Sequence, residues 1–258
     1  MKARDLIELL KGTTQLSKTC DTIKFGDERK EIFKVAVCMV PTIDVIRSAK
    51  EWGADMVIFH EPLYYNHWDV PMSDIVTQVK RSVVESSEMV FFRYHDYMHS
   101  SLIDEIIEGE LTSLGLSGNL KDGAVFVLDQ PLTALTLAKL IEDRLNISHV
   151  RIAGELNKEA TKIALRFGDG MSSGMIDVIN DDDVEIVLTG ETVEWMVSEY
   201  VRDAKSIGRN KSLIVMGHIG SERDGMKVLT EKLKKKVPSV TFRYLECGEV
   251  YFYTDKIN

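Results

Sequence analysis

Apolar and polar positions follow two alternating patterns along the chain, short apolar runs and longer amphipathic stretches with helical spacing. In the first half the apolar runs predict strands at residues 34–40, 54–59 and 89–94. In the second half they predict strands at 162–167, 184–188 and 212–216. Regular alternation of strands and helices is typical of α/β proteins. We therefore expect an α/β fold of two similar, intertwined domains, with mixed sheets flanked by helices.

Capping residues predict where the helices begin. Thr42 is expected to cap a helix that ends at Trp52, and Ser73 is expected to cap one that runs to about Glu88. The same signals predict further helices at about 100–114, from near 133, at 192–207 and at 223–236.

The segments at the two ends of the chain are expected to complete the sheets. Residues 22–25 and 32–40 are predicted to pair as a hairpin across the turn at Gly26. The tail is predicted to form two strands, at 240–245 and 250–254.

With 258 residues, the chain is long enough for one large domain or two intertwined ones. The turn at Lys121-Asp122-Gly123 is the best candidate for a boundary. We therefore expect an N-terminal domain at residues 1–123 and a C-terminal domain at 124–258, with the final strands packing back on the first domain.

The overall charge and the cysteines limit the classes of partner and compartment. A net charge of −9 disfavours a nucleic-acid partner, which would require a basic surface. Cys20, Cys38 and Cys247 lie far apart, as is typical of reduced thiols in a cytoplasmic protein. Neither a signal peptide nor a membrane span is apparent, so we expect a cytoplasmic location and no membrane partner.

Histidines and carboxylates gather where predicted strands end. The clusters are His60-Glu61, His95-Asp96-Tyr97-Met98-His99 and His218-Ile219-Gly220-Ser221-Glu222. In α/β sheets, ligands bind outside the carboxyl ends of the strands. Imidazole together with carboxylate suits Zn, Fe or Mn, so the sequence predicts a metal site.

The geometry of two of these clusters leaves alternatives open. His60 and Glu61 are adjacent, so on an extended chain they would serve two metals, whereas a bend would allow one. His95 and His99 would share a face only if their segment is helical. His95 and Asp96 are candidates for ligands or for acid–base residues. His67, in an aromatic loop at residues 64–68, would line a substrate pocket or cover an oligomer contact.

The two halves align at these clusters. When the halves are aligned, Phe59-His60-Glu61 matches Thr189-Gly190-Glu191. The segment from His95 to His99 likewise aligns with the segment from His218 to Glu222. The second pair shares two potential ligands four residues apart. This favours duplication over chance similarity of two generic α/β units.

Together the clusters resemble the Nif-three-like family of dinuclear-metal proteins, which includes GTP cyclohydrolase 1 type 2 homologues. The matching segments are Gly53-Ala54-Asp55 with His60-Glu61-Pro62, His95 with His99, Asp183 with Thr189-Gly190-Glu191, and Gly217-His218 with Ser221-Glu222-Arg223. The resemblance implies two divalent metal ions and, position by position, these ligands: His60, Glu61, His99, His218 and Glu222. It also implies a homohexamer of two-domain subunits.

Two substitutions mark the chain as a divergent branch of the group that it resembles. Glu61 stands where the family has a second histidine, and His99 stands where it has an aspartate. The resemblance still implies a metal-dependent hydrolase, with a purine nucleotide as the small-molecule substrate. For such a reaction we expect His95 and Asp96, from their own chemistry, to be the catalytic acid–base residues. The alternative is a non-catalytic metal-binding oligomer with a regulatory or scaffolding role.

Overall fold

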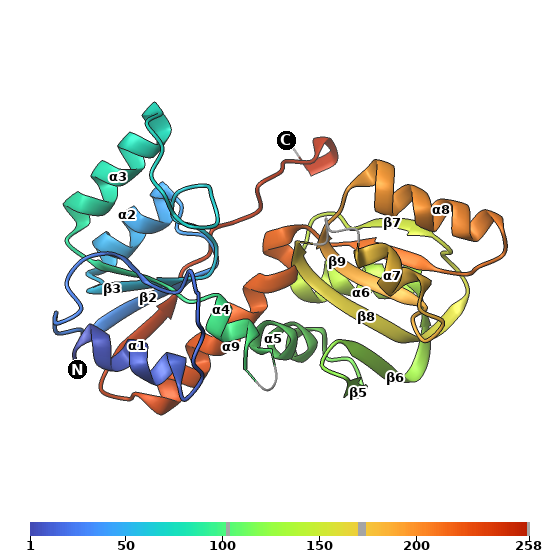
Figure 1. Cartoon of the computed structure of the whole chain (residues 1–258), viewed down its shortest axis with the longest axis horizontal. Helices are drawn as coiled ribbons and strands as arrows, with labels where there is room; N and C mark the ends of the chain where they lie inside the picture. Colours follow the sequence, from blue (N-terminus) through green and yellow to red (C-terminus); the bar gives the residue numbers. More distant parts are fainter. Residues whose placement is uncertain (102–103, 170–173, 257–258) are drawn as a thin grey trace. The chain divides into compact units, whose positions relative to one another are not determined.

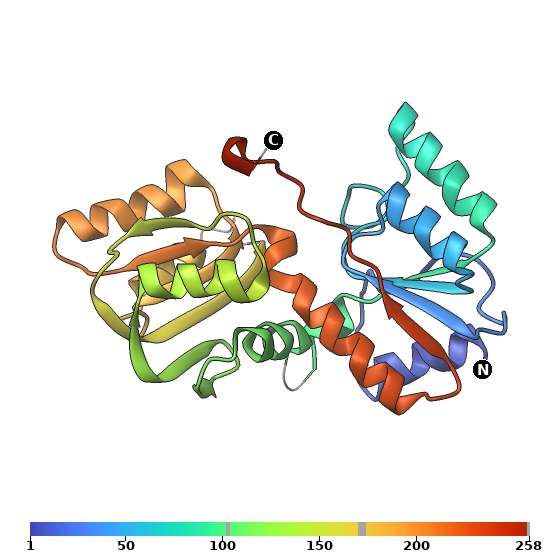
Figure 2. The same cartoon turned by 180° about the vertical axis from the view of Figure 1, so that it is seen from behind.

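A five-stranded sheet and a six-stranded sheet organise the chain, and each belongs to its own unit (Figures 1 and 2). The computed structural model describes residues 1–101, 104–169 and 174–256. The first unit comprises Met1–Ile106 and Gly225–Gly248, and the second comprises Ile107–Asp224 and Glu249–Asn258.

The sheet of the first unit has the order β1-β4-β3-β2-β11. Its strands are β1 (Ile23–Phe25), β2 (Lys34–Cys38), β3 (Met56–Phe59), β4 (Val90–Arg93) and β11 (Thr241–Tyr244). All neighbours pair in parallel except β1, which runs antiparallel to β4. The carboxyl ends of β2, β3 and β4 therefore lie at one edge of the sheet.

Helices cover both faces of this sheet. They are α1 (Ala3–Lys11), α2 (Ile43–Trp52), α3 (Ile75–Ser87), the short α4 (Asp96–His99), and the part of α9 (His218–Lys236) that follows Asp224. Helices α2 and α3 lie on one face, and α1 and α9 lie on the other (Figures 1 and 2).

The sheet of the second unit has the order β5-β6-β8-β9-β10-β7, in which β8, β9 and β10 are parallel. Its strands are β5 (Gly118–Lys121), β6 (Val125–Thr133), β7 (Arg151–Gly154), β8 (Glu159–Asp169), β9 (Ile186–Glu191) and β10 (Ser212–Val215). Its helical segments are α5 (Glu105–Leu114), α6 (Ala134–Leu145), α7 (Gly174–Asn180), the π-helical turn η1 (Glu194–Ser198), α8 (Glu199–Ser206), the start of α9, and η2 (Thr254–Lys256).

Period-two alternation along the central strands divides the core of the second unit into two layers. Ile163 and Leu165 of β8 pack with Leu137 and Ile141 of α6. Ala164, between them in sequence, packs in a separate cluster with residues of α7 and α8. Successive side chains of a strand point to opposite faces, so a strand buried on both faces reads as a continuous apolar run.

The expected mixed α/β architecture is confirmed, and two of the helix starts are confirmed in detail. Thr42 accepts a hydrogen bond from the backbone N–H of Val45, and Thr133 accepts one from that of Thr136. These are N-cap interactions, which satisfy a donor that the helix itself leaves without a partner.

Other local predictions were wrong. The cap of α3 is Asp74, whose carboxylate accepts the N–H groups of Val76 and Thr77, and not Ser73. The hairpin of residues 22–25 with 32–40 does not form, because β1 pairs with β4 instead. Residues 250–253 are irregular rather than a strand.

Two helix boundaries also differ from the prediction. Helix α9 begins at His218, five residues before the expected start at Arg223. Helix α5 begins at Glu105 rather than near Ser100, and residues 102 and 103 of the expected helix lie outside the described residues.

The candidate boundary turn lies within a hairpin. Lys121 of β5 pairs with Val125 of β6 across Asp122 and Gly123, which both have positive φ. In sequence the two compact units divide between Ile106 and Ile107, within α9 between Asp224 and Gly225, and between Gly248 and Glu249. Strand β11 pairs with β2 of the first unit, as expected for the tail. Among the described helices, none combines the length and hydrophobicity needed to cross a bilayer.

Candidate metal centre

Parallel pairing brings the first two clusters together at one edge of the first sheet. In the register of β3 with β4, Phe59 lies beside Arg93. The residues that follow the two strands, His60 on one and Tyr94 and His95 on the other, therefore leave the sheet side by side. This is the edge at which α/β proteins bind ligands.

The chain bends immediately after β3. The backbone N–H groups of His60 and Glu61 both donate to the carbonyl oxygen of Met39, at 3.2 and 3.0 Å. An extended strand would direct these two N–H groups to opposite sides. The bend is the geometry that two adjacent ligands of one site would require.

Three imidazole rings gather at this edge. The ring centroid of His60 lies 4.6 Å from that of His95 and 5.1 Å from that of His99, and the last two are 4.8 Å apart. One potential ligand atom from each ring lies within 4.8 Å of the others. The expected shared face of His95 and His99 forms because α4 is a single helical turn.

Each of these rings is oriented through its Nδ1 atom. Nδ1 of His60 lies 3.1 Å from the carbonyl oxygen of Tyr94, which accepts hydrogen bonds only. Nδ1 of His95 lies 2.8 Å from Oδ1 of Asp96, and Nδ1 of His99 lies 2.8 Å from Oδ2 of Asp104. A proton held on Nδ1 leaves the lone pair on Nε2, which is the arrangement found in metal-bound histidines.

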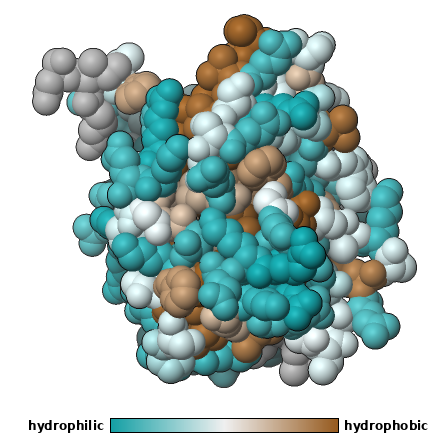
Figure 3. Space-filling model, turned by 90° about the vertical axis from the view of Figure 1, so that its left-hand side faces the viewer, coloured by the Kyte–Doolittle hydropathy of each residue, from teal (hydrophilic) through white to brown (hydrophobic). Residues whose placement is uncertain are grey.

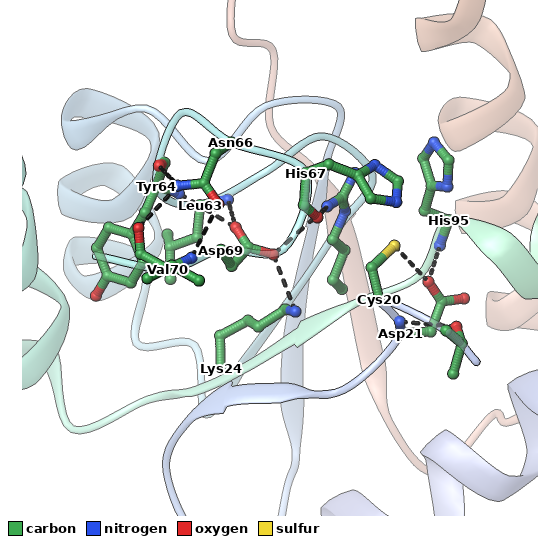
Figure 4. A network of polar contacts seen from close by, with 12 residues as sticks. Cys20, Asp21, Lys24, Leu63, Tyr64, Asn66, His67, Asp69, Val70 and His95 are labelled. Carbon is green, nitrogen blue, oxygen red and sulfur yellow. Dashed lines mark hydrogen bonds and ion pairs between the residues drawn. The ribbon is translucent and has the colours of Figure 1, made fainter. Parts of the chain in front are cut away.

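Asp21 fixes the start of α4 from a distant part of the chain. Its carboxylate accepts hydrogen bonds from the backbone N–H groups of His95, Asp96 and Tyr97, each at 2.9 Å. Figure 4 shows the contact with His95. These N–H groups belong to the first turn of the helix and have no hydrogen-bond partner within it. Asp21 therefore acts as an N-cap supplied from outside the helix, and it positions the rings of His95 and His99.

Burial sets the protonation of this cluster. Desolvation lowers the pKa of His60 well below 6.5, and the neighbouring His95 lowers it further. The pKa of His95 is lowered by burial and by the proximity of His99. Burial raises the pKa of Asp96, but hydrogen bonds from the backbone N–H of Cys20 and from His95 outweigh it, so the net shift is strongly downward. Neutral imidazoles and an ionised carboxylate are the states that bind cations.

A buried ion-pair network supports the aromatic loop beside the cluster (Figure 4). Asp69 accepts the backbone N–H groups of Leu63 and Tyr64, and its Oδ2 lies 3.0 Å from Nζ of Lys24 and 3.5 Å from Nη1 of Arg93. Arg93 also donates to the carbonyl oxygens of His60 and His67, at 2.8 and 2.6 Å. The loop is thereby tied to the strand end that carries His60.

The same loop brings His67 to the edge of the cluster. Its ring centroid lies 5.9 Å from that of His95 and 4.8 Å from the ring of Trp68. His67 thus lines the surroundings of His95, although Tyr65 and Trp68 of the same loop are largely exposed.

The second unit builds a related arrangement from β9 and β10. These strands are parallel, and the backbone N–H of Gly217 donates to the carbonyl oxygen of Gly190 just beyond the paired residues, at 2.9 Å. His218 therefore leaves the sheet beside Glu191. Its Nδ1 lies 3.1 Å from Oε1 of Glu191, and its Nε2 lies 3.3 Å from Oε2 of Glu222.

Small residues make room for Glu222. A Cβ atom on Gly168 would lie 2.3 Å from its Oε1, and one on Gly190 would lie 2.5 Å from Oγ of Ser221. The hydroxyl of Ser221 accepts the backbone N–H of Gly168 at 3.0 Å. A side chain at Gly168 would displace the carboxylate, and one at Gly190 would displace the Ser221 hydroxyl. The close packing at Gly168 therefore fixes Glu222 next to His218.

Within each unit, the sequence-predicted residues come together. His60, His95 and His99 form one group in the first unit, and His218 and Glu222 form another in the second. Glu61 lies beside the first group, with Oε2 4.0 Å from Nη2 of Arg93. The assignment of particular residues as ligands or as acid–base groups stays a prediction.

The sequence analysis missed two carboxylates that orient this chemistry, Asp21 and Asp104. Asp104 follows His99 by five residues, which is a recognisable but unspecific signal. Asp21 precedes His95 by more than 70 residues, and only the pairing of β1 with β4 brings it to α4.

A second group of possible ligands in the first unit, Cys20, Asp21, His95 and Asp96, is already joined by hydrogen bonds among its members. Asp21 caps α4 with both carboxylate oxygens. Asp96 accepts from Cys20 N–H at 2.8 Å and from His95. Burial raises the pKa of the Cys20 thiol to about 12, which disfavours the thiolate that metals bind.

Comparison with known proteins gives consistent matches along the whole chain. A family model described as Duf34/NIF3 (NGG1p interacting factor 3) matches residues 1–248. A GTP cyclohydrolase 1 type 2 homolog of Clostridium perfringens is 27% identical over 93% of this chain and 94% of its own length.

Solved structures share the fold. The protein ybgI, described as of unknown function, superposes with a TM-score of 0.80 at 18% identity, over 97% of this chain and all of that one. A Bacillus cereus protein related to NIF3 superposes with a TM-score of 0.78 at 14% identity, over 98% of this chain and 99% of that one. The resemblance expected from the sequence is therefore confirmed.

Proposed function

The chain belongs to the Duf34/NIF3 family, and from that starting point we propose that it is a divalent-metal-binding protein that acts as a metal-dependent hydrolase. The proposed substrate is a purine nucleotide, with a GTP cyclohydrolase-like reaction. This substrate class comes from the name of the curated relatives and from the sequence resemblance.

One observation carries the metal-binding part of the proposal. Four histidines at the candidate centre, His60, His95, His99 and His218, each have Nδ1 against an oxygen acceptor. The acceptors are a backbone carbonyl or a carboxylate, the usual partners of metal-bound imidazoles.

We propose two divalent ions, Zn, Fe or Mn, held in a dinuclear centre by His60, Glu61, His99, His218 and Glu222. The neutral imidazoles favoured by burial in the first unit, and the carboxylate packed against Gly168 in the second, support this donor set. When bound, such ions supply an acidified water and polarise a substrate oxygen.

The acid–base role falls to His95 and Asp96. His95 is held by Asp96 through Nδ1, so its Nε2 is the atom that would accept and release a proton. Asp96 orients the ring and stabilises its protonated form, and Asp21 holds both residues through their backbone N–H groups. The loop that carries His67 would exclude water from one side of this group.

The alternative is a non-catalytic metal-binding oligomer, and an exposed apolar surface favours the oligomeric part. We define the apolar patch as Tyr65, Trp68, Val70, Met72, Ile75, Val76 and Val79, which are 44–71% exposed. Apolar side chains gather over the upper end of α3 in Figure 3. Contiguous exposed apolar surface marks interaction sites, so we propose that the patch contacts another copy in a homo-oligomer, with a hexamer as the family resemblance implies.

We also propose a cytoplasmic location. No disulfide joins the three cysteines, which all lie within the described residues, and Cys20 and Cys38 are buried. Buried thiols without disulfides suit a reducing compartment.

A hydrolysis screen of metal-loaded protein tests the catalytic part. GTP, other purine nucleotides and phosphoesters would be incubated with wild type and with the His218→Ala, Glu222→Ala double variant. Turnover by wild type that the double variant lacks would support the hydrolase. Metal binding by wild type without turnover of any compound would favour the non-catalytic alternative.

A further inference from the structure

A pocket in the second unit opens beside His218. It has a volume of about 170 Å³. Its walls come from the end of β10, the start of α9 and the C-terminal tail, and its lining is mainly apolar. Ile147, Met216 and Ile219 form one part of the wall, and Val250, Tyr251 and Tyr253 of the tail form another.

The tail is held in place by specific contacts. The ring of Tyr253 stacks on His149 with a centroid distance of 4.3 Å and an interplanar angle of 26°. Nε2 of His149 lies 3.1 Å from Oδ2 of Asp255, and Oε1 of Glu249 accepts the backbone N–H of Ser148 at 2.8 Å. These contacts anchor the tail at both ends of the segment that lines the pocket.

The acidic groups that line the pocket are two carboxylates. Glu191 and Glu249 both contribute to the lining, whereas none of the described lining residues is Lys or Arg. Oε1 of Glu191 is engaged with His218, and Oε1 of Glu249 is engaged with Ser148. A carboxylate has about four acceptor positions. Oε2 of Glu191 and Oε2 of Glu249 can therefore accept hydrogen bonds from a ligand. A phosphate or other anion would be repelled.

We propose that this pocket binds the base of a purine nucleotide, and that it selects a guanine-type ring through Glu249. This inference rests on the proposed function, because it specifies the substrate of that same centre. The apolar walls and the tyrosine rings suit a planar heterocycle. The edge of guanine presents two adjacent donors, its N1–H and its 2-amino group, which match a single carboxylate in the way that paired N–H groups of arginine do.

Other bases fit this chemistry less well. Adenine presents an acceptor nitrogen next to its amino group, so its edge would place a lone pair against Glu249. Hypoxanthine lacks the 2-amino group and retains one donor. The pocket volume lies below the roughly 300–1,000 Å³ typical of sites for drug-sized ligands, which limits the occupant to one ring system with its phosphates outside.

Calorimetric titration of nucleosides into the full-length protein tests the proposal. Nucleosides carry no phosphate, so a phosphate–metal contact does not contribute. Guanosine is expected to bind more tightly than inosine, and inosine more tightly than adenosine. Glu249→Gln retains an oxygen that can accept the Ser148 N–H but replaces the second acceptor with a donor, so we expect guanosine affinity to fall about tenfold or more.

Two controls separate recognition from folding. Glu194→Gln removes an exposed carboxylate of η1 that pairs with Arg151 outside the pocket, and this variant should bind guanosine like wild type. Tyr251→Ala should weaken guanosine binding, and Tyr251→Phe should preserve it, because only the stacking surface is needed.

Unchanged guanosine affinity in Glu249→Gln, equal affinity for adenosine, or no binding of guanosine by wild type at millimolar concentration would overturn the proposal. Metal content measured on the same samples keeps the two proposals distinct. Guanosine selectivity without bound metal would support the pocket and refute the metal centre. Bound metal without guanosine selectivity would support the metal centre and refute the pocket.

Discussion

Oδ2 of Asp104 lies 2.8 Å from Nδ1 of His99. This carboxylate has no ligand role in the proposed centre, yet it determines which nitrogen of His99 carries the proton. The same relationship recurs in the second unit between Glu191 and His218. An orienting carboxylate behind a candidate ligand is characteristic of metal sites, and it gives the account a specific experimental test.

Asp104→Asn should weaken metal binding about 10- to 100-fold, since loss of an outer partner of a metal-bound histidine typically has an effect of this size. Competition with a chromogenic chelator would measure the affinity. Asp203→Asn, at an exposed position of α8, provides the matched control and should bind metal like wild type. Equal affinity in both variants would exclude the orienting role.

The double variant His218→Ala, Glu222→Ala should lose most of the bound metal without unfolding. Both residues belong to the proposed ligand set, and the hydrophobic clusters of the second unit do not include them. Elemental analysis and far-ultraviolet circular dichroism of the same sample would test both parts. A native spectrum with the wild-type metal content would refute the ligand assignment.

The stability of metal-free protein should fall as the pH drops below about 6.5. Burial lowers the pKa of His60 and His95 in the folded state, so in this range the unfolded chain binds more protons than the folded one. Stability then rises with pH, by at most about 1.4 kcal/mol per pH unit for each histidine, and is fully present above 6.5. Above that pH neither state protonates these rings.

Urea unfolding at pH 7 and at pH 5.5 would measure this dependence. His60→Gln should reduce the difference in midpoint between the two pH values. His149→Gln is the control, because that ring lies at the tail and is only partly buried. A pH dependence unchanged in His60→Gln would show that His60 is not buried in its neutral form.

Asp69→Asn should destabilise the protein by about 3 kcal/mol. Asparagine tolerates the positive φ of 57° at this position and can still accept the loop N–H groups. It removes the carboxylate that pairs with buried Lys24 and leaves Arg93 with only the more distant Glu61, and breaking a buried ion pair in this way typically costs about 3–5 kcal/mol. Asp44→Asn on the exposed surface of α2 should change the unfolding free energy by less than about 0.5 kcal/mol in the same assay.

Ile75→Asp combined with Val79→Asp should reduce the oligomeric mass. Both side chains belong to the apolar patch, and new charges there would be buried if the patch contacts another copy. Size-exclusion chromatography with light scattering would report the mass. Ile207→Asp changes a comparably exposed apolar residue outside the patch and should leave the mass unaltered.

The sequence allowed the fold class and the site segments to be predicted because both depend on local patterns. Apolar runs define β3 and β4, and parallel neighbours end at the same edge, so His60 and His95 were expected to meet. Likewise Thr42 and Thr133 are local caps that can be recognised from a few residues.

The features that the sequence did not predict depend mainly on contacts between distant segments of the chain. Strand β1 pairs with β4 rather than with its sequence neighbour, and no local pattern encodes that choice. The capping role of Asp21 depends on this pairing, so it could not be predicted from the sequence either. The sequence did not predict the early start of α9 at His218, where Gly217 has the positive φ that turns the chain into the helix.

Metal quantification of protein purified without chelators or added metal tests the central claim most directly. Plasma mass spectrometry of the isolated chain, repeated after loading with Zn, Mn or Fe and desalting, would give the stoichiometry. The account predicts about two divalent ions per chain in the loaded wild type, and a marked loss in the His218→Ala, Glu222→Ala variant. A wild-type chain that retains no more metal than this variant, in every condition, would contradict it.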